Sequence, residues 1–185
     1  MADAQAVEVI GQAEIAAAIK AATSEVFTTM LGMEVSSDGE VTRTEANSPS
    51  SGVVSLIGLA GSWVGTGSLV CSAALACKLS ALFLMSEFEA VNDEVLDAVA
   101  EITNMILGNV KTTLEERLGA MGLSTPTVIY GRNFQTRSAR IHEWTVVPFH
   151  CFEDTLYVQL CLAPNRDAGM ATVRPGFQLP QILSV

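Results

Sequence analysis

The sequence predicts an α+β fold in which one antiparallel sheet is covered by helices. Two long stretches carry apolar residues at helical spacing, and each is followed by runs rich in Val, Ile and Leu that are separated by turn residues. Strands joined by short turns pair antiparallel and bury one face of their sheet under helices. The chain has no strand–helix–strand alternation with a glycine-rich phosphate loop, so a nucleotide-binding α/β fold is not expected.

The composition is that of one domain, here residues 1–185, built around a sizeable core. Apolar residues make up 49% of the chain and charged residues 16%, so burial of apolar surface can offset the entropy lost on ordering. The net charge of −10 argues against nucleic acid as a partner, because phosphate binding needs a basic surface. Without a signal-peptide pattern or CxxC pairs, we expect a cytoplasmic protein with reduced thiols.

The elements can be placed one by one. In order, we expect a helix over 5–31, two short extended pieces within 34–50 around an Asp38-Gly39 turn, strands over 52–59 and 62–71, helices over 72–85 and 92–120, a strand over 125–130, and a hairpin of 143–149 with 156–162 around Glu153-Asp154. The first helix is alanine-rich and stops at Gly32. Ser72 is a plausible N-cap of the second helix, and Gly119 ends the third.

The residues between 46 and 77 carry no charge, which raises the alternative of a membrane span. Gly61 and Gly65 even have the GxxxG spacing of helix contacts in membranes. Glycine and serine divide this stretch into two short apolar pieces, however, and neither flank has the Lys/Arg cluster that sets membrane orientation. We therefore expect a buried hairpin and no membrane span.

The helix over 92–120 carries the chemistry. With Asp97 at zero on a helical wheel, Glu101 lies at about +40°, Asn104 at about −20° and Gly108 at about +20°. The opposite side carries the apolar residues Val95, Val99, Ile102, Ile106 and Val110. The polar row could simply be solvated, but Asn is a poor helix former, and Gly108 costs roughly 1 kcal/mol in a helix interior. Gly108 suits either packing against another helix or close approach by a partner. Two residues with low helix propensity on one face suggest a functional site.

Glu101 and Asn104 lie on adjacent turns, about 5–6 Å apart at Cβ, so both can reach one small target. A carboxylate can pair with a lysine, and a carboxamide can donate and accept hydrogen bonds and so orient a water molecule. Such a pair is incomplete by itself, because a partner must bring the electrophile and any metal ion. Cysteine phosphatases need a Cys-x5-Arg loop, which is absent from the chain.

The pattern Asp-xxx-Glu-xx-Asn formed by Asp97, Glu101 and Asn104, with Pro126 downstream, resembles the signature of the CheX/CheC/FliY phosphatases of bacterial chemotaxis. The resemblance extends from about residue 10 to the C-terminal strands, although the spacing from Asn104 to Pro126 is one residue shorter than in the family. Residues 5–31 hold no second Glu-xx-Asn. One motif per chain is similar to CheX, which implies a two-layer α+β fold with one long motif helix and a homodimer.

The resemblance implies a phosphatase that hydrolyses the aspartyl phosphate of a CheY-type receiver domain. Glu101 would pair with the receiver's lysine, Asn104 would align the attacking water, and Asp97 and Gly108 would contact the partner. Mg²⁺ would be held by the receiver, so the chain itself would need no metal or other cofactor. The alternative is a dimeric, non-catalytic adaptor that binds a receiver domain or a flagellar-switch-type partner through the same fold.

Overall fold

The structure is a computed structural model that describes residues 10–37, 39, 41–43, 51–132 and 143–165. Its strands are β1 Ser36–Ser37, β2 Val41–Arg43, β3 Ser51–Gly61, β4 Trp63–Cys71, β5 Met121–Leu123, β6 Thr127–Arg132, β7 Trp144–Cys151 and β8 Asp154–Pro164. Its helices are α1 Gln12–Val26, the π-helical turn η1 Phe27–Leu31, α2 Ala73–Leu84 and α3 Asp93–Leu118. These elements confirm the predicted α+β class.

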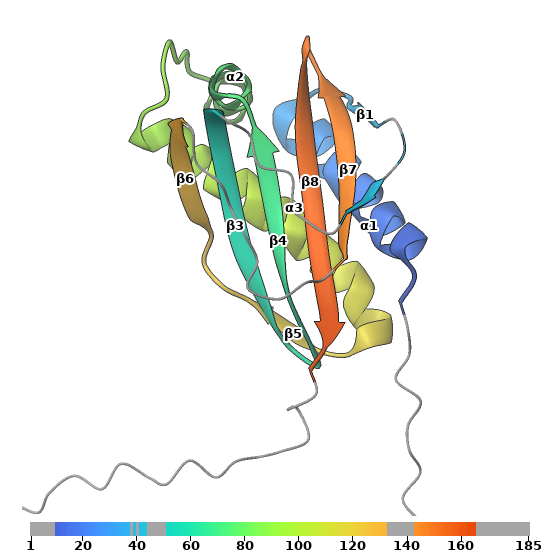
Figure 1. The fold of residues 1–185 in the computed structure, drawn as a ribbon. Helices are drawn as coiled ribbons and strands as arrows, with labels where there is room; N and C mark the ends of the chain where they lie inside the picture. The colour runs from blue at the N-terminus through green and yellow to red at the C-terminus, as the bar shows by residue number, and fades with distance from the viewer. Residues whose placement is uncertain (1–9, 38, 40, 44–50, 133–142, 166–185) are drawn as a thin grey trace, which may run out of the picture.

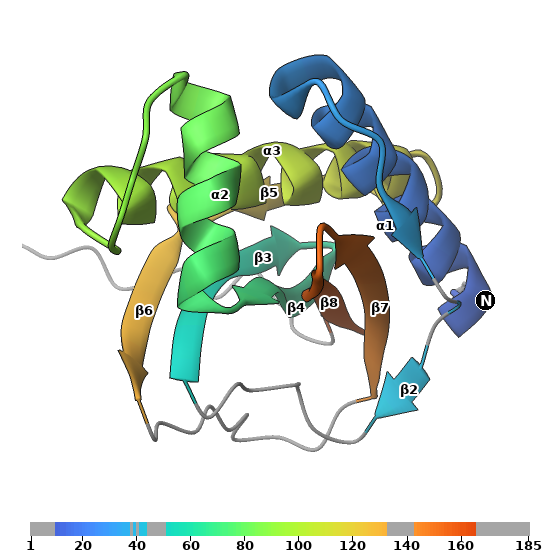
Figure 2. The same ribbon diagram turned by 90° about the horizontal axis from the view of Figure 1, so that it is seen from above.

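All strand pairs are antiparallel and form one eight-stranded sheet in the order β1-β7-β8-β4-β3-β5, with β2 also on β7 and β6 also on β3. Helices α1 and α3 lie side by side on one face of this sheet, and α2 lies across one of its ends (Figures 1 and 2). The arrangement is the expected sheet covered by helices, and α3 runs the length of the covered face.

Within the uncharged stretch, Ser51–Gly61 and Trp63–Cys71 form the hairpin of β3 and β4 at the centre of the sheet, as predicted. No helix in the described part of the chain has the length and apolar character needed to cross a membrane. Gly67 lies directly under α3, where an added Cβ would come within 2.6 Å of Leu107 Cδ1. A glycine at this point lets α3 approach the middle of the sheet closely, which fixes the depth of the helix.

Helix α1 is shorter than the predicted range of 5–31. Within the described residues it begins at Gln12 after an extended Gly11, and residues 1–9 lie outside the description. The last turn widens into the π-helix η1, and Gly32 ends it with φ 64°, as expected. The other predicted helix ends agree within two residues, and the Ser72 hydroxyl caps α2 by accepting a 3.0 Å bond from the Leu75 N–H.

Several strand boundaries differ from the predictions for local reasons. The strand expected over 125–130 begins at Thr127, after Pro126, which has no N–H to donate to a ladder. The last hairpin turns at Phe152-Glu153, because Asp154 already pairs with Cys151. Strand β5 lies where a loop was expected, and its apolar Met121 is only 5% exposed in the core.

Strands β1 and β2 follow one another along β7, so they do not fold back on each other at the predicted Asp38-Gly39 turn. Of that turn, Gly39 has the positive φ typical of a turn glycine, at 87°, whereas Asp38 lies outside the described residues. Residues 44–50 of the predicted polar stretch also lie outside them.

Candidate functional site

Helix α3 is stabilised locally at both ends. At its start the Asn92 side chain accepts a 2.9 Å hydrogen bond from the Val95 N–H, and Asp93 and Glu94 complement the positive end of the helix dipole. Arg117 lies in the last turn, at the negative end. The helix is therefore well formed over the two turns that carry the motif.

The side of α3 that was predicted to be buried is buried. Val95, Val99, Ile102, Ile106 and Val110 are each at most 1% exposed and belong to the main hydrophobic core. Burying a side chain of this size contributes roughly 1.5–3 kcal/mol relative to leaving it in water. The helix cannot rotate without exposing this row, so the direction of its outer face is fixed.

The outer face presents the four predicted site residues together. Asp97 and Glu101 are exposed, and Asn104 and Gly108 are partly exposed. Among the described residues, no hydrogen bond or ion pair occupies the side chains of Asp97, Glu101 or Asn104. Their carboxylate and amide groups are therefore available to a partner.

Packing against the described part of the chain does not require a glycine at position 108. The nearest atom that an added Cβ would meet is Leu123 Cδ1, at 3.9 Å, which is an ordinary van der Waals distance. Alanine would fit this position and is favoured in helices by about 1 kcal/mol. Of the two explanations offered for this glycine, helix packing within the chain does not apply.

Neighbouring elements hold α3 along its length. The Ser80 hydroxyl of α2 donates a 3.2 Å bond to the Val95 carbonyl, and the Asn109 amide donates a 3.3 Å bond to Glu25 of α1. Arg117 forms an ion pair with Glu14. A site carried by an anchored helix keeps its geometry better than a site on a loop.

The connection from β5 to β6 follows Leu123, whose side chain lies near Gly108. It therefore borders the motif face, which is the outer side of α3 with Asp97, Glu101, Asn104 and Gly108. The Gly58 N–H donates a 2.9 Å bond to the Ser124 hydroxyl, and the Ser124 N–H donates a 2.9 Å bond to the Gly58 carbonyl. Pro126 lies in this connection, two residues beyond Ser124. Sequence reasoning did not identify these two hydrogen bonds, because they join Gly58 and Ser124, which are far apart in the chain.

The cysteines offer no nucleophile. Cys71, Cys77, Cys151 and Cys161 are free and buried, as expected. Burial raises the pKa of Cys161 to about 11, and burial together with the nearby Asp154 carboxylate raises the pKa of Cys151 to about 12. Both remain protonated at neutral pH, and a thiol is a poor nucleophile compared with its thiolate.

The four predicted site residues lie on a helix surface and do not line the hollow that the structure shows elsewhere. The hollow of about 590 Å³ formed by α2 and the β7–β8 turn is lined by none of the predicted site residues. In the described part of the chain, no three His, Cys, Asp or Glu side chains gather in a group that could hold a metal ion. The pair Glu101 and Asn104 can bind a cation and orient water, but the reacting bond must come from a partner.

Comparison with known families identifies the chain by its central region. The family profile described as "Chemotaxis phosphatase CheX" matches residues 53–150, which run from β3 through the motif helix to β7. No curated protein is significantly similar to the chain.

Solved structures agree with this match. The chemotaxis protein CheX from Vibrio vulnificus is 26% identical, with a TM-score of 0.70 over 81% of this chain and 99% of that one. A putative chemotaxis protein from Desulfovibrio vulgaris Hildenborough is 26% identical, with a TM-score of 0.71 over 85% and 100%. The CheX-CheY-BeF3-Mg²⁺ complex from Borrelia burgdorferi matches at 26% identity and a TM-score of 0.68 over 83% and 99%. With the fold, the motif helix and the profile in agreement, the chain belongs to the CheX family of chemotaxis phosphatases.

Proposed function

We propose that the chain hydrolyses the aspartyl phosphate of a CheY-type response regulator, with Glu101 and Asn104 as its catalytic pair. The observation that carries this proposal is that Glu101 is exposed and Asn104 partly exposed on an anchored helix, with no partner for either among the described residues. Membership of the CheX family and the similarity to a CheX from a complex with CheY support a receiver domain as the partner.

In the proposed mechanism the receiver provides the phosphorylated aspartate, and its Mg²⁺ and lysine neutralise charge on the phosphoryl group. The Glu101 carboxylate pairs with that lysine and so sets the position of the receiver on α3. The Asn104 carboxamide orients a water molecule in line with the bond from phosphorus to the aspartate oxygen. Water adds to phosphorus, that bond breaks, and inorganic phosphate and the free aspartate carboxylate leave.

The energy required of this chain is modest because an acyl phosphate is already labile. A hundredfold acceleration corresponds to about 2.7 kcal/mol of transition-state stabilisation. One well-placed amide can supply this amount if the receiver binds in a fixed orientation. Asp97 supports docking, and the missing side chain at Gly108 lets the receiver backbone come close to α3.

The test is phosphate release from phosphorylated receivers of the same organism, measured with the wild type and with Asn104→Ala. The variant is expected to bind the receiver as before and to lose about a hundredfold in rate, with the same melting temperature. Thr113→Ala, an exposed position on the same helix but away from the row of Asp97, Glu101, Asn104 and Gly108, is the matched control and should keep full activity. Equal rates for wild type and Asn104→Ala would reject the catalytic assignment.

The alternative function, a non-catalytic adaptor, gives a different result in the same experiment. An adaptor would bind the receiver, but the phosphoryl group would decay at the rate of the receiver alone. Asn104 is partly exposed and has no partner among the described residues. It favours the phosphatase, because a carboxamide can donate and accept hydrogen bonds and so orient a water molecule.

The proposal includes a homodimer. It is supported by the single motif per chain and by the high apolar content of 49%. Light scattering at micromolar concentration is expected to give twice the chain mass, and a monomer under these conditions would contradict it.

A further inference from the structure

A second unusual feature lies at the end of the sheet, away from the motif residues. Within the described ranges, two residues other than glycine have positive φ: Met85 at 52° and Phe152 at 56°. Both have large apolar side chains, and Met85 is 93% exposed and Phe152 53% exposed. Left-handed backbone disfavours such residues, and glycine would fit both turns without strain.

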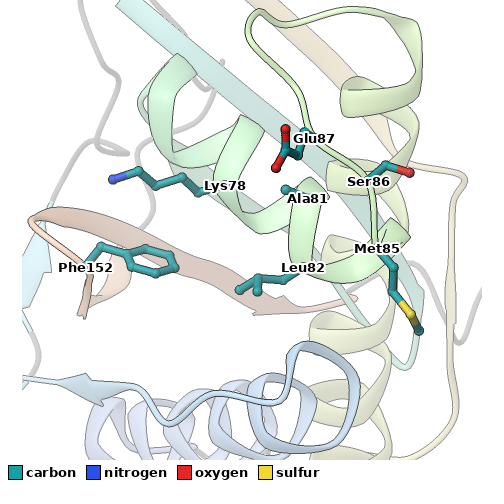
Figure 3. A pocket seen from close by; sticks show the side chains of 7 residues that line it. All are labelled: Lys78, Ala81, Leu82, Met85, Ser86, Glu87 and Phe152. Carbon is teal, nitrogen blue, oxygen red and sulfur yellow. The ribbon is translucent and has the colours of Figure 1, made fainter.

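The two residues line the same hollow of about 590 Å³, together with Leu82, which is 38% exposed. They come from separate elements: Met85 ends α2, whereas Phe152 is the first residue of the β7–β8 turn. In the view of Figure 3, the side chain of Leu82 lies between those of Phe152 and Met85. Met85 and Phe152 both have an unfavourable backbone conformation, and both expose apolar side chains at the same hollow. This combination points to a binding function.

The hollow adjoins the motif helix. Helix α2 crosses the end of the sheet and packs against α3, with the Ser80 hydroxyl bonded to the Val95 carbonyl at 3.2 Å (Figure 2). The connection after Met85 leads directly to the first residue of α3. A partner that covers the start of α3 therefore reaches the rim of the hollow next.

The motif face alone is too small to hold a protein. From Asp97 to Gly108 it is about 16 Å long, and at the ~10 Å width of a helix it covers on the order of 160 Å². A stable interface buries about 800 Å² on each partner. The partner of α3 must therefore contact further surface, and apolar surface contributes most per unit area.

The charges near the hollow also indicate that a partner needs apolar contacts beyond the motif face. Glu87 lines the hollow together with Lys78, and Glu89, Asp93 and Glu94 are exposed in the chain between the hollow and Asp97. Since the receiver's own phosphorylation site is acidic, these charges oppose its approach. Lys78, whose ammonium lies 5.1 Å from the Phe152 ring centroid, is the cation at the hollow that can meet a receiver carboxylate.

We propose that the hollow formed by Leu82, Met85 and Phe152, with Lys78 at its rim, is a second contact surface for the same phosphorylated receiver domain. The hollow supplies affinity, whereas α3 supplies the chemistry. This assignment rests on the proposed function, but it concerns residues that the motif does not contain.

The test is the double variant Met85→Gly with Phe152→Gly, because glycine suits both backbone conformations. If the side chains served folding, the variant would be less stable. The expected result is an unchanged or higher melting temperature, with an apparent KM for phosphorylated receiver raised roughly tenfold and kcat within twofold of the wild type. Binding of receivers from the same organism, loaded with BeF3 and Mg²⁺, should weaken by the same factor. Met30→Ala, which removes an apolar side chain 47% exposed outside the hollow, should change none of these quantities.

Two results would overturn the assignment while leaving the proposed function intact. One is a wild-type KM in the double variant, and the other is conversion of a dimer to a monomer, which would make the hollow an interface between two copies of this chain. If the wild type binds none of the receivers and releases no phosphate from them, the proposed function itself fails and the assignment fails with it.

Discussion

On its inner side α3 buries Val99, Ile102 and Ile106, each at most 1% exposed, whereas its outer side presents Asp97, Glu101 and Asn104 to solvent. The inner residues are held by the core, and the outer ones have no partner among the described residues. The inner side therefore determines where the helix lies, and the outer side determines what the helix can do. Substitutions on the two sides are expected to affect different measurements.

The largest expected effect is on stability and comes from Ile102→Ala. Removing this fully buried side chain should cost about 2–5 kcal/mol of unfolding free energy, because a cavity is left in the core. Its neighbour Glu101 is exposed, so Glu101→Ala should change stability by less than about 0.5 kcal/mol and abolish most phosphate release. Urea denaturation and phosphate release measured on both variants would test this division, and a large loss of stability in Glu101→Ala would break it.

Gly108→Ala should have a smaller effect, which is favourable for stability and unfavourable for activity on the receiver. Because the added Cβ lies 3.9 Å from Leu123 Cδ1, the variant should be more stable by about 0.4–1 kcal/mol. If the receiver docks against α3 as proposed, the same methyl group should raise the KM for phosphorylated receiver. A variant that is more stable and equally active would show that the receiver does not approach this glycine.

The smallest expected effect concerns the end of α3. Glu115 accepts a 2.6 Å bond from Lys111 and a 2.6 Å bond from the Met121 N–H, and these bonds lower its pKa below the ordinary value of 4.5. A lowered folded-state pKa stabilises the protein above pH 4.5, and this contribution is lost as the pH falls through the folded-state pKa. Thermal melts should show Glu115→Gln less stable than the wild type at pH 7, with the difference shrinking on acidification. A difference that is constant from pH 7 to pH 3 would contradict this role.

The sequence predicted those features that depend on periodicity and on local turn chemistry. The row of Val95, Val99 and Ile102 identified the inner side of α3, and Ser72 was a recognisable helix cap. The shared face of Asp97, Glu101, Asn104 and Gly108 also followed from spacing, because residues at this spacing on one helix lie on one side whatever surrounds the helix.

The short strand β5 and the start of β6 were placed less well. Met121 pairs with Gly61, a residue about sixty positions earlier, and no local sequence pattern predicts such a contact. The hollow was likewise not predictable, since the positive φ of Met85 and Phe152 contradicts their residue types. Strain of this kind is imposed by surrounding structure and is invisible in the sequence.

The sequence by itself therefore determined the class of the fold, the buried and exposed sides of α3 and the placement of Glu101 and Asn104 on its outer side, because each depends on residues within a few turns of one another. Only the tertiary structure decided that the described residues leave room for a side chain at Gly108 and that α2 and the β7–β8 turn line one hollow. Those facts depend on contacts between distant segments, which form when the whole core assembles and which no single segment encodes.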